Sequence, residues 1–257
     1  MLLHIEKIGQ GEPLIMLHGW GMHSGMWMQT RDILSKHFTL YMIDFPGMGH
    51  SETIAPYHMQ SLVQLIKAEL AKNEIPANAN LLAWSLGSLV GMKLAMELPI
   101  KKLVLVGSTP CYVNRDDWQL GTPLPVFSSF FSGMLNNFKA TMNKLLALIA
   151  LGGHNPQATS KVLREVFASR PLPNQQALQA TLDILLETDL RSEISKLTMP
   201  TLVIHGEHDK LCPIEGAEWL AQTLPNAQFI KMQHAAHEPF ISHPQAFSQH
   251  VSEFLSA

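Results

Sequence analysis

Short, almost continuously apolar runs recur along this chain, and longer segments with helical periodicity separate most of them. The runs cover residues 13–19, 38–44, 79–85, 101–108, 201–207 and 227–232. Such runs are typical of parallel strands that are covered on both faces. Helical patterns at 61–73, 215–225 and 244–255 complete an alternation that predicts an α/β fold, with a mostly parallel sheet flanked by helices. We expect the first strand, at about residues 2–8, to form an antiparallel edge hairpin.

One long segment breaks this alternation. Residues 110–196 contain no clear buried strand, although the stretches 138–151, 157–169 and 174–187 have helical patterns. An irregular loop of that length is improbable in a compact domain. We therefore expect a helical lid insertion over 110–196, set on a core that is formed by residues 1–109 and 197–257.

Composition limits what such a fold can do. The net charge of −3 provides no basic surface for nucleic acid. No apolar run reaches the roughly 18 residues that a membrane span needs, and the first residues lack the pattern of a secretion signal. Two cysteines among 257 residues fit a reducing compartment. We expect a soluble cytoplasmic monomer with no nucleic-acid or membrane partner.

The stretch Ala83-Trp84-Ser85-Leu86-Gly87 lies where an apolar strand ends and a helix begins. It differs by one residue from the G-x-S-x-G turn, in which the strand bends so sharply that the serine hydroxyl is exposed above the sheet. The residues two before and two after the serine must be small, as Ala83 and Gly87 are. We interpret Ser85 as a nucleophile; the alternative is that it only caps the helix.

A serine nucleophile needs a base, a group that orients the base, and donors for the oxyanion. In folds with this turn, the acid follows the serine along the chain and the histidine comes last. Asp209 and His237 each follow a predicted strand, so they would lie at the same edge of the sheet as Ser85. His234 is the rival base, and Glu207 is the rival acid.

The backbone N–H groups of Trp20 and Leu86 form the predicted oxyanion hole. Trp20 lies in the stretch Leu17–Gly21, which follows a predicted strand and should run beside the nucleophile. Leu86 directly follows the serine. A plain tight turn is the alternative explanation of the glycine-rich stretch.

Other reactive side chains have simpler explanations. The spacing of His205 and His208 could indicate a metal, but no third ligand is evident in the sequence. Asp44, a more remote rival acid, is expected to order the turn after its strand. Cys111 and Cys212 are expected to be small buried residues. The sequence therefore predicts neither a metal nor a cofactor.

With these motifs in this order, the chain resembles the α/β-hydrolase superfamily over nearly its full length. More narrowly, it is similar to the carboxylesterases of biotin synthesis. The closer resemblance is carried by residues 17–21, 37–51, 84–91, 108–118, 186–191 and 235–244. It implies hydrolysis of the methyl ester of a pimeloyl chain on acyl carrier protein, with release of methanol. Ser85 would attack the carbonyl, His237 would move the proton, and Asp209 would orient His237.

The resemblance also implies roles for the lid. The substrate would contact Trp20, Ser85, Leu86 and His237 near the ester, and Leu145, Leu146, Ala147, Leu148 and Ile149 along the acyl chain. Acyl carrier protein, the implied partner, would contact Lys144 and Lys161. We add the nearby Lys139 and Arg164 to this predicted contact surface. Ordinary packing of the lid on the core and a solvated surface are the respective alternatives.

Two other functions stay open at this point. A promiscuous short-acyl carboxylesterase or a carbon–carbon bond hydrolase would use the same three catalytic residues, so only substrate profiling separates them. A non-catalytic ligand-binding relative would fail to hydrolyse p-nitrophenyl acetate. Enzymes with an aspartate nucleophile are disfavoured because Ser85 occupies the turn.

Overall fold

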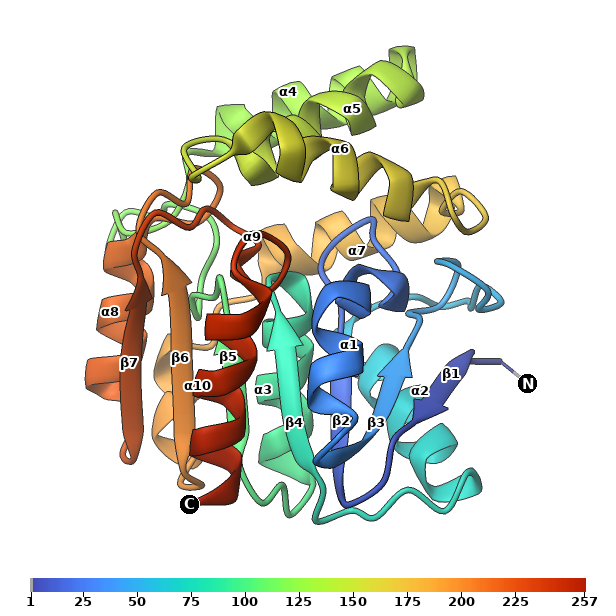
Figure 1. The fold of residues 1–257 in the computed structure, drawn as a ribbon. Helices are drawn as coiled ribbons and strands as arrows, with labels where there is room; N and C mark the ends of the chain where they lie inside the picture. The colour runs from blue at the N-terminus through green and yellow to red at the C-terminus, as the bar shows by residue number, and fades with distance from the viewer. Residues whose placement is uncertain (1) are drawn as a thin grey trace.

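The computed structural model describes residues 2–257, without the side chains of residues 129–131 and 135. Within these residues, seven strands form one sheet in the order β1-β3-β2-β4-β5-β6-β7 (Figure 1). The strands are β1 (Ile5–Ile8), β2 (Glu12–Leu17), β3 (Phe38–Ile43), β4 (Asn80–Trp84), β5 (Leu103–Val106), β6 (Thr201–Gly206) and β7 (Ala227–Met232). All neighbouring strands are parallel except β1 and β3. The predicted α/β class with a mostly parallel sheet is confirmed.

The edge strand β1 is antiparallel, as expected, but it does not form a hairpin with the strand that follows it. β1 pairs with β3, where Ile5 lies opposite Ile43, and β2 pairs with β3 and β4. The chain between β1 and β2 therefore passes the end of β3. Gly9 and Gly11 make this passage with φ values of 87° and 116°, which glycine adopts without a steric penalty.

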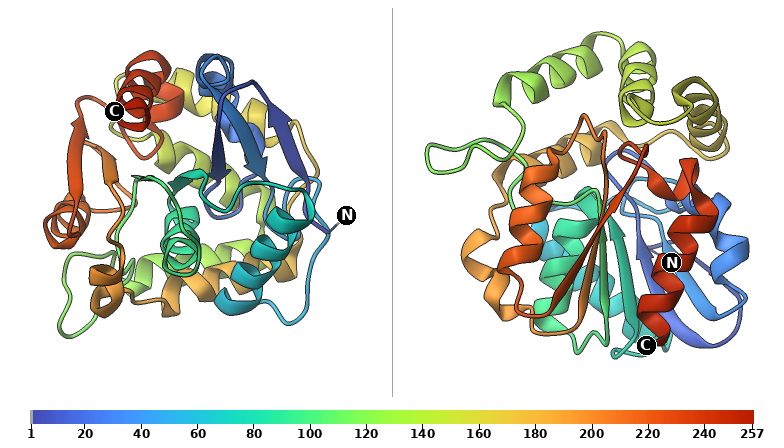
Figure 2. Two further views of the ribbon diagram at one scale, coloured as in Figure 1. Left: turned by 90° about the horizontal axis from the view of Figure 1, so that it is seen from below. Right: turned by 60° about the vertical axis from the view of Figure 1, so that its left-hand side comes forward.

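Helices cover both faces of the sheet (Figures 1 and 2). One face carries α1 (Met28–Leu34), which follows the short 3-10 helix η1 (Ser24–Trp27), with α9 (Pro239–Ser242) and α10 (Pro244–Ser256). The other carries α2 (Met59–Lys72), α3 (Leu86–Glu97) and α8 (Ile214–Thr223). Along β4, Leu81 and Ala83 pack on the α3 face, whereas Leu82 and Trp84 pack on the α10 face. Burial on both faces explains the continuously apolar strands.

Between β5 and β6 the chain forms α4 (Leu124–Asn136), α5 (Phe138–Ala150), α6 (Pro156–Phe167) and α7 (Gln175–Glu187), followed by the 3-10 helix η2 (Arg191–Lys196). α4, α5 and α6 lie above the carboxyl ends of the strands, and α7 runs between them and the sheet (Figures 1 and 2). None of the helices in residues 2–257 combines the length and apolar character of a membrane span.

Helix α4 was not predicted, because prolines, serines and a glycine interrupt its pattern. Pro123 precedes the helix and Pro125 lies in its first turn, where a missing N–H costs no hydrogen bond. Gly133 is in the last turn, and a Cβ there would lie 2.7 Å from Thr141 Oγ1 of α5. The apparent helix breakers therefore begin the helix and allow its close contact with α5.

Candidate active site

Ser85 occupies a sharp turn between β4 and α3. Its φ of 56° and ψ of −124° are rare for a residue with a side chain, and such backbone strain is concentrated at functional sites. Ser85 makes no side-chain capping hydrogen bond to α3, which weighs against a purely capping role. A Cβ on Gly87 would lie 2.6 Å from the His18 carbonyl oxygen and 2.7 Å from that of Leu17. The turn therefore requires glycine at this position.

The predicted acid and base are in direct contact. His237 Nδ1 lies 2.6 Å from Asp209 Oδ2; because an ionised carboxylate can only accept, Nδ1 carries the proton and Nε2 is free to act as a base. Asp209 Oδ1 accepts the backbone N–H groups of Leu211 and Cys212 at 2.8 and 2.9 Å. Burial alone would raise the pKa of Asp209, but His237 and these donors hold the pKa below its ordinary value.

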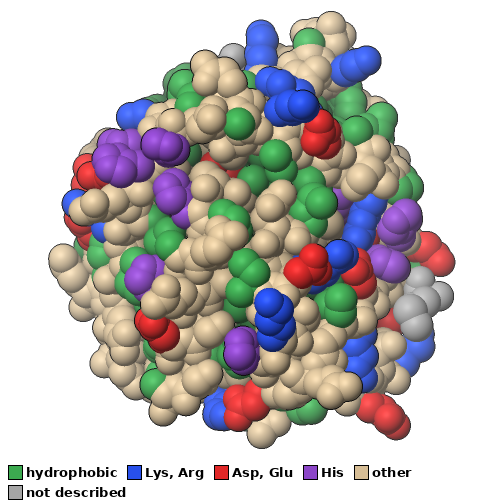
Figure 3. Space-filling model, viewed as in Figure 1, with side chains coloured by type: hydrophobic (Ala, Val, Ile, Leu, Met, Phe, Trp, Pro, Cys, Tyr) green, Lys and Arg blue, Asp and Glu red, His purple; other side chains and the backbone are tan. Residues whose placement is uncertain are grey.

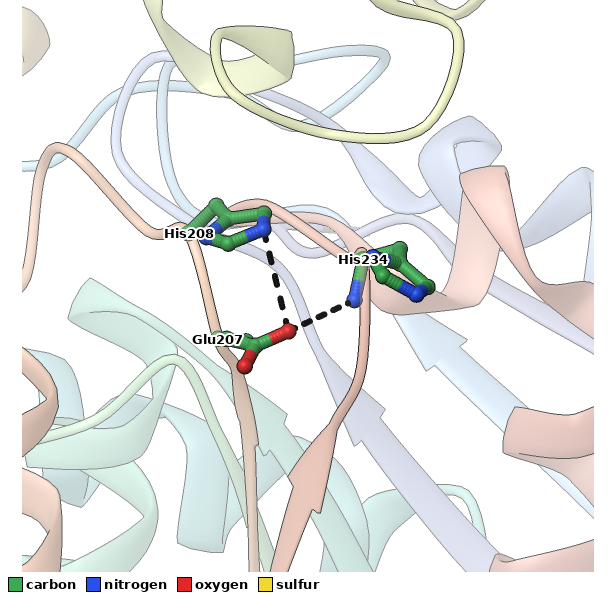
Figure 4. Close-up of side chains that lie close together, drawn as sticks. All are labelled: Glu207, His208 and His234. Carbon is green, nitrogen blue, oxygen red and sulfur yellow. Dashed lines mark hydrogen bonds and ion pairs between the residues drawn. The ribbon is translucent and has the colours of Figure 1, made fainter.

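The rival acid and base contact each other on the outside of the same loops (Figure 4). Glu207 Oε2 accepts the His234 backbone N–H at 3.1 Å and lies 3.7 Å from His208 Nε2. The Glu207 side chain is 32% exposed, whereas the Asp209 side chain is fully buried beside His237. The geometry thus favours the predicted pair over its rivals.

His237 is positioned by groups that the sequence did not reveal as functional. The buried Trp84 indole N–H donates to the His237 carbonyl oxygen at 2.9 Å, and the two rings are 5.5 Å apart. The His237 backbone N–H donates to the Ile149 carbonyl oxygen of α5 at 3.2 Å. A Cβ on Gly107, after β5, would lie 3.0 Å from the His237 ring. The residue before the serine, the lid and a glycine together hold the base.

Ser85 and His237 line one small cavity of about 60 Å³. Its other walls are mainly apolar and include Trp20, Trp84, Phe127, Leu145, Ile149 and Leu185. Within residues 2–257, the Ser85 hydroxyl makes no hydrogen bond to the His237 ring by the usual geometric limits. Catalytic contacts of this kind are often long until substrate binds.

The two predicted oxyanion donors belong to segments that adjoin the nucleophile. A Cβ on Gly19 would lie 3.2 Å from Ser85 Cβ, so the loop that carries Trp20 runs directly beside the serine. Leu86 is the first residue of α3. No turn or loop hydrogen bond within the described residues uses the backbone N–H of Trp20 or Leu86. The Trp20 indole N–H anchors its loop to the Leu178 carbonyl oxygen of α7 at 3.0 Å.

Asp44, the more remote rival acid, belongs to a separate buried network. Its Oδ2 lies 2.9 Å from Arg170 Nη1, and the carboxylate also accepts the backbone N–H groups of Ser24 and His50 at 2.7 and 3.0 Å. Arg170 Nη2 continues to Glu6 Oε2 at 2.8 Å. Since Arg170 lies between α6 and α7, this network fastens the helical segment to the end of β3. The sequence predicted the ordering role of Asp44 but not its arginine partner.

The five residues predicted to contact the acyl chain, 145–149, differ in their surroundings. Leu145 and Ile149, one helical turn apart, line the cavity that contains Ser85. Leu146 is buried in the core beside α6, Leu148 is half-buried, and Ala147 is exposed. The structure thus brings two of these five residues to the site and turns Ala147 toward solvent.

A second cavity, of about 550 Å³, lies between α4, α5 and α7. Its lining includes Met134, Phe138, Leu172, Gln175, Gln179 and Leu182. Trp20 lines this cavity and also the small one. Trp20 is therefore a wall common to the reaction pocket and a much larger cavity.

The predicted carrier-binding residues lie on α5 and α6. Lys139, Lys144, Lys161 and Arg164 are exposed, and Figure 3 shows Lys and Arg side chains gathered over this end of the molecule. Lys161 forms a loose ion pair with Glu165 at 3.9 Å. These positions leave the basic side chains accessible to a partner.

The remaining candidates have structural surroundings. Cys111 and Cys212 are buried, and burial raises the pKa of the Cys212 thiol. The buried His205 donates from Nε2 to the Cys212 carbonyl oxygen at 2.9 Å, and the same nitrogen lies 3.4 Å from Asp209 Oδ2. His205 therefore supports the turn that carries Asp209, and burial lowers its pKa. The partly exposed His208 faces Glu207 instead.

Glu238 is a buried acid that sequence reasoning overlooked. It directly follows His237 and is fully buried, and neither of its carboxyl oxygens has a hydrogen-bond partner among the described residues. Burial raises its pKa from the ordinary 4.5 to about 8. The side chain is therefore held neutral beside the catalytic loop at pH 7.

Comparisons with known proteins agree on the fold and on one group of relatives. The family model for the alpha/beta hydrolase fold matches residues 12–244. The chain is 34% identical over 256 residues to the pimeloyl-[acyl-carrier protein] methyl ester esterase of Nitrosospira multiformis, covering 98% of this chain and 97% of the relative. The protein of the same name from Nitrosomonas europaea is 37% identical over 247 residues, covering 95% and 96%. An esterase structure from Exiguobacterium antarcticum aligns with a TM-score of 0.90 at 21% identity, covering 99% and 96%.

The first prediction concerns the nucleophile. Ser85→Ala should lower kcat for p-nitrophenyl butyrate by at least about 10³-fold, because it removes the hydroxyl that attacks the substrate. Circular dichroism should stay unchanged, and labelling by a fluorophosphonate probe should be lost. Ser88→Ala is the matched control and should keep its label, since Ser88 Oγ is buried and donates to the Ala83 carbonyl oxygen. Labelling that survives in Ser85→Ala would contradict the assignment.

The second prediction separates the two acids. Asp209→Asn should lower kcat by about 10³–10⁴-fold, because the amide favours the wrong tautomer of His237. Glu207→Gln, two residues away and partly exposed, should stay near the wild-type rate. For the base, His237→Ala should lower kcat about as much as Ser85→Ala does, whereas His234→Ala should have only a small effect. A larger loss in Glu207→Gln than in Asp209→Asn would show that the acid is misassigned.

The third prediction concerns Glu238. Because its folded pKa of about 8 lies above its ordinary 4.5, the folded state should lose stability as pH rises between these values. Glu238→Gln cannot ionise, so its stability relative to wild type should increase by on the order of 3 kcal/mol between about pH 5 and about pH 8.5. Urea unfolding at both pH values measures this difference. The same pH dependence in both proteins would refute the buried neutral acid.

Proposed function

The chain belongs to the α/β-hydrolase family, and from that premise we propose that it is a serine carboxylesterase acting on the methyl ester of pimeloyl-acyl-carrier protein. The observation that carries the proposal is the contact between Asp209 and His237 beside Ser85. It occurs in a chain that is 34–37% identical, over nearly full length, to esterases named for this substrate. The products would be methanol and a pimeloyl chain with a free carboxylate.

The acylation step follows from the groups in the small cavity. Ser85 Oγ attacks the ester carbonyl carbon while His237 Nε2 takes the hydroxyl proton. The backbone N–H groups of Trp20 and Leu86 stabilise the negative charge on the carbonyl oxygen. Asp209 stabilises the imidazolium through Nδ1, and His237 then returns the proton to the departing methoxide, which leaves as methanol.

Deacylation reuses the same groups in the same order. His237 Nε2 takes a proton from a water molecule as its oxygen attacks the acyl-Ser85 carbonyl. The tetrahedral intermediate collapses, the proton returns to Ser85, and the carboxylic acid is released. This cycle needs no electron transfer, so the residues named here account for every proton and bond.

The two cavities suit a substrate with a small alcohol and a long acyl chain. The pocket at Ser85, of about 60 Å³, is large enough for the reacting ester group but not for a long chain. The cavity of about 550 Å³ that adjoins it at Trp20 has a largely apolar lining, which suits a methylene chain. We assign the extended part of the substrate to this larger cavity.

The basic residues on α5 and α6 support a carrier-binding surface. Acyl carrier protein is acidic, while this chain has a net charge of −3, so any electrostatic attraction must be local. Lys144 and Lys161 are exposed on the helices that cover the cavities. Such surface charges mainly affect encounter rate and orientation. The proposal includes action in the cytoplasm as a monomer. Light scattering of the purified protein tests the monomeric state.

The function is tested with the purified enzyme and pimeloyl-acyl-carrier protein methyl ester. We expect stoichiometric methanol release and a mass loss of one methylene on the carrier, at a kcat/KM well above that for p-nitrophenyl butyrate. Expression in a biotin auxotroph that lacks its methyl ester esterase should restore growth. An active esterase that fails both tests would instead be a general short-acyl hydrolase.

The fourth prediction concerns the basic surface. Lys144→Glu combined with Lys161→Glu should lower kcat/KM for the carrier-bound methyl ester by about tenfold, since each surface contact contributes up to about 1 kcal/mol. Hydrolysis of p-nitrophenyl butyrate should not change, because that substrate never meets the carrier. Added salt should reduce the wild-type advantage.

The matched control for this prediction is Lys36→Glu combined with Lys7→Glu, which changes the net charge equally at exposed positions outside α5 and α6, on β1 and after α1. This control should keep wild-type kcat/KM for the carrier substrate. Equal losses in both double variants would make the effect one of net charge. Equal losses on both substrates would mean that the helices themselves are disturbed.

A further inference from the structure

Three side chains that the proposed esterase chemistry does not use lie together at the surface. Glu207 and His208 follow β6, and His234 follows β7. One potential ligand atom from each lies within 4.8 Å of those from the other two. Figure 3 shows histidine side chains gathered over this part of the molecule, above the ends of β6 and β7. Two imidazoles and one carboxylate form a donor set typical of zinc-type ions.

One of the three separations between these groups is already close to that of a metal centre. Glu207 Oε2 and His208 Nε2 are 3.7 Å apart. Ligands about 2.0–2.1 Å from a tetrahedral zinc ion lie about 3.4 Å from each other. The rings of His208 and His234 have centroids 6.2 Å apart and are inclined by 47°, so they do not stack on each other. Small side-chain rotations at an accessible surface would complete the geometry.

The backbone already holds two of the three ligands in place. The His234 N–H donates to Glu207 Oε2 at 3.1 Å, and in Figure 4 dashed lines join this oxygen to both histidines. The His234 carbonyl oxygen accepts the His154 N–H at 2.8 Å, and His234 has a φ of 57°. Outer hydrogen bonds of this kind orient metal ligands.

From these observations we propose that Glu207, His208 and His234 bind one divalent transition-metal ion of the zinc type, with the remaining position open to water. None of the three residues lines the cavity that contains Ser85. The ion would instead join the turn that leads to Asp209 to the turn that leads to His237. Its role is to stabilise the protein by fixing these two turns relative to each other.

The test uses tag-free protein that has been treated with EDTA and dialysed. Titration with Co²⁺ should produce the visible absorption of a low-symmetry centre with a stoichiometry of one, and Zn²⁺ should displace it. Calorimetry should give the same stoichiometry for Zn²⁺, and Tm should rise with Zn²⁺ concentration, because the ion binds only the folded site. Wild-type protein without saturable binding below about 1 mM would overturn the proposal.

Variants identify the ligands. His234→Gln, His208→Gln and Glu207→Gln should each raise the Kd for Zn²⁺ by at least about tenfold and remove the Tm increase. His37→Gln, at an exposed histidine away from these loops, is the matched control and should bind like wild type. His237→Ala should also keep the ion. Binding that is lost only in His237→Ala, or that survives in all three ligand variants, would refute this site.

Discussion

The close approach of separate backbone segments at the carboxyl edge of the sheet is the constraint on which the site depends. Gly87 lets the first turn of α3 lie against the end of β2, and Gly107 makes room for the His237 ring. Gly206 plays the same part for the Ala236 carbonyl at the end of β6. Because these positions lack a Cβ, loops that are distant in sequence converge around Ser85.

The buried carboxyl groups near this edge of the sheet differ in whether they are ionised. Asp209 is buried but ionised, because the backbone N–H groups and His237 that face it compensate for its lost hydration. Glu238, only one residue from His237, has no such partners among the described residues and stays neutral. Asp44 is compensated by Arg170, which also fastens the helical segment above the sheet. Buried carboxyl groups with hydrogen-bond or ion-pair partners thus stay ionised, whereas the one without such partners is neutral.

Much of this arrangement could be predicted from the sequence. Continuously apolar strands identified the parallel sheet, and the order of Ser85, Asp209 and His237 selected the residues that the structure brings to one edge. Contacts that depend on three-dimensional packing were not accessible. These include the Trp84 bond to the His237 carbonyl oxygen and the pairing of β1 with β3 rather than β2. Helix α4 was missed because local propensity does not register its contact with α5.

The central claim is that Ser85 carries the acyl group of a carrier-bound methyl ester during turnover. Rapid acid quenching of the enzyme with pimeloyl-acyl-carrier protein methyl ester, followed by proteolysis and mass spectrometry, tests this claim directly. The account predicts a transient ester adduct on the peptide that contains Ser85, formed together with a burst of methanol. An adduct on any other residue would contradict the account. A burst of methanol with no covalent intermediate on the enzyme would also contradict it, because the burst shows that acylation is faster than deacylation.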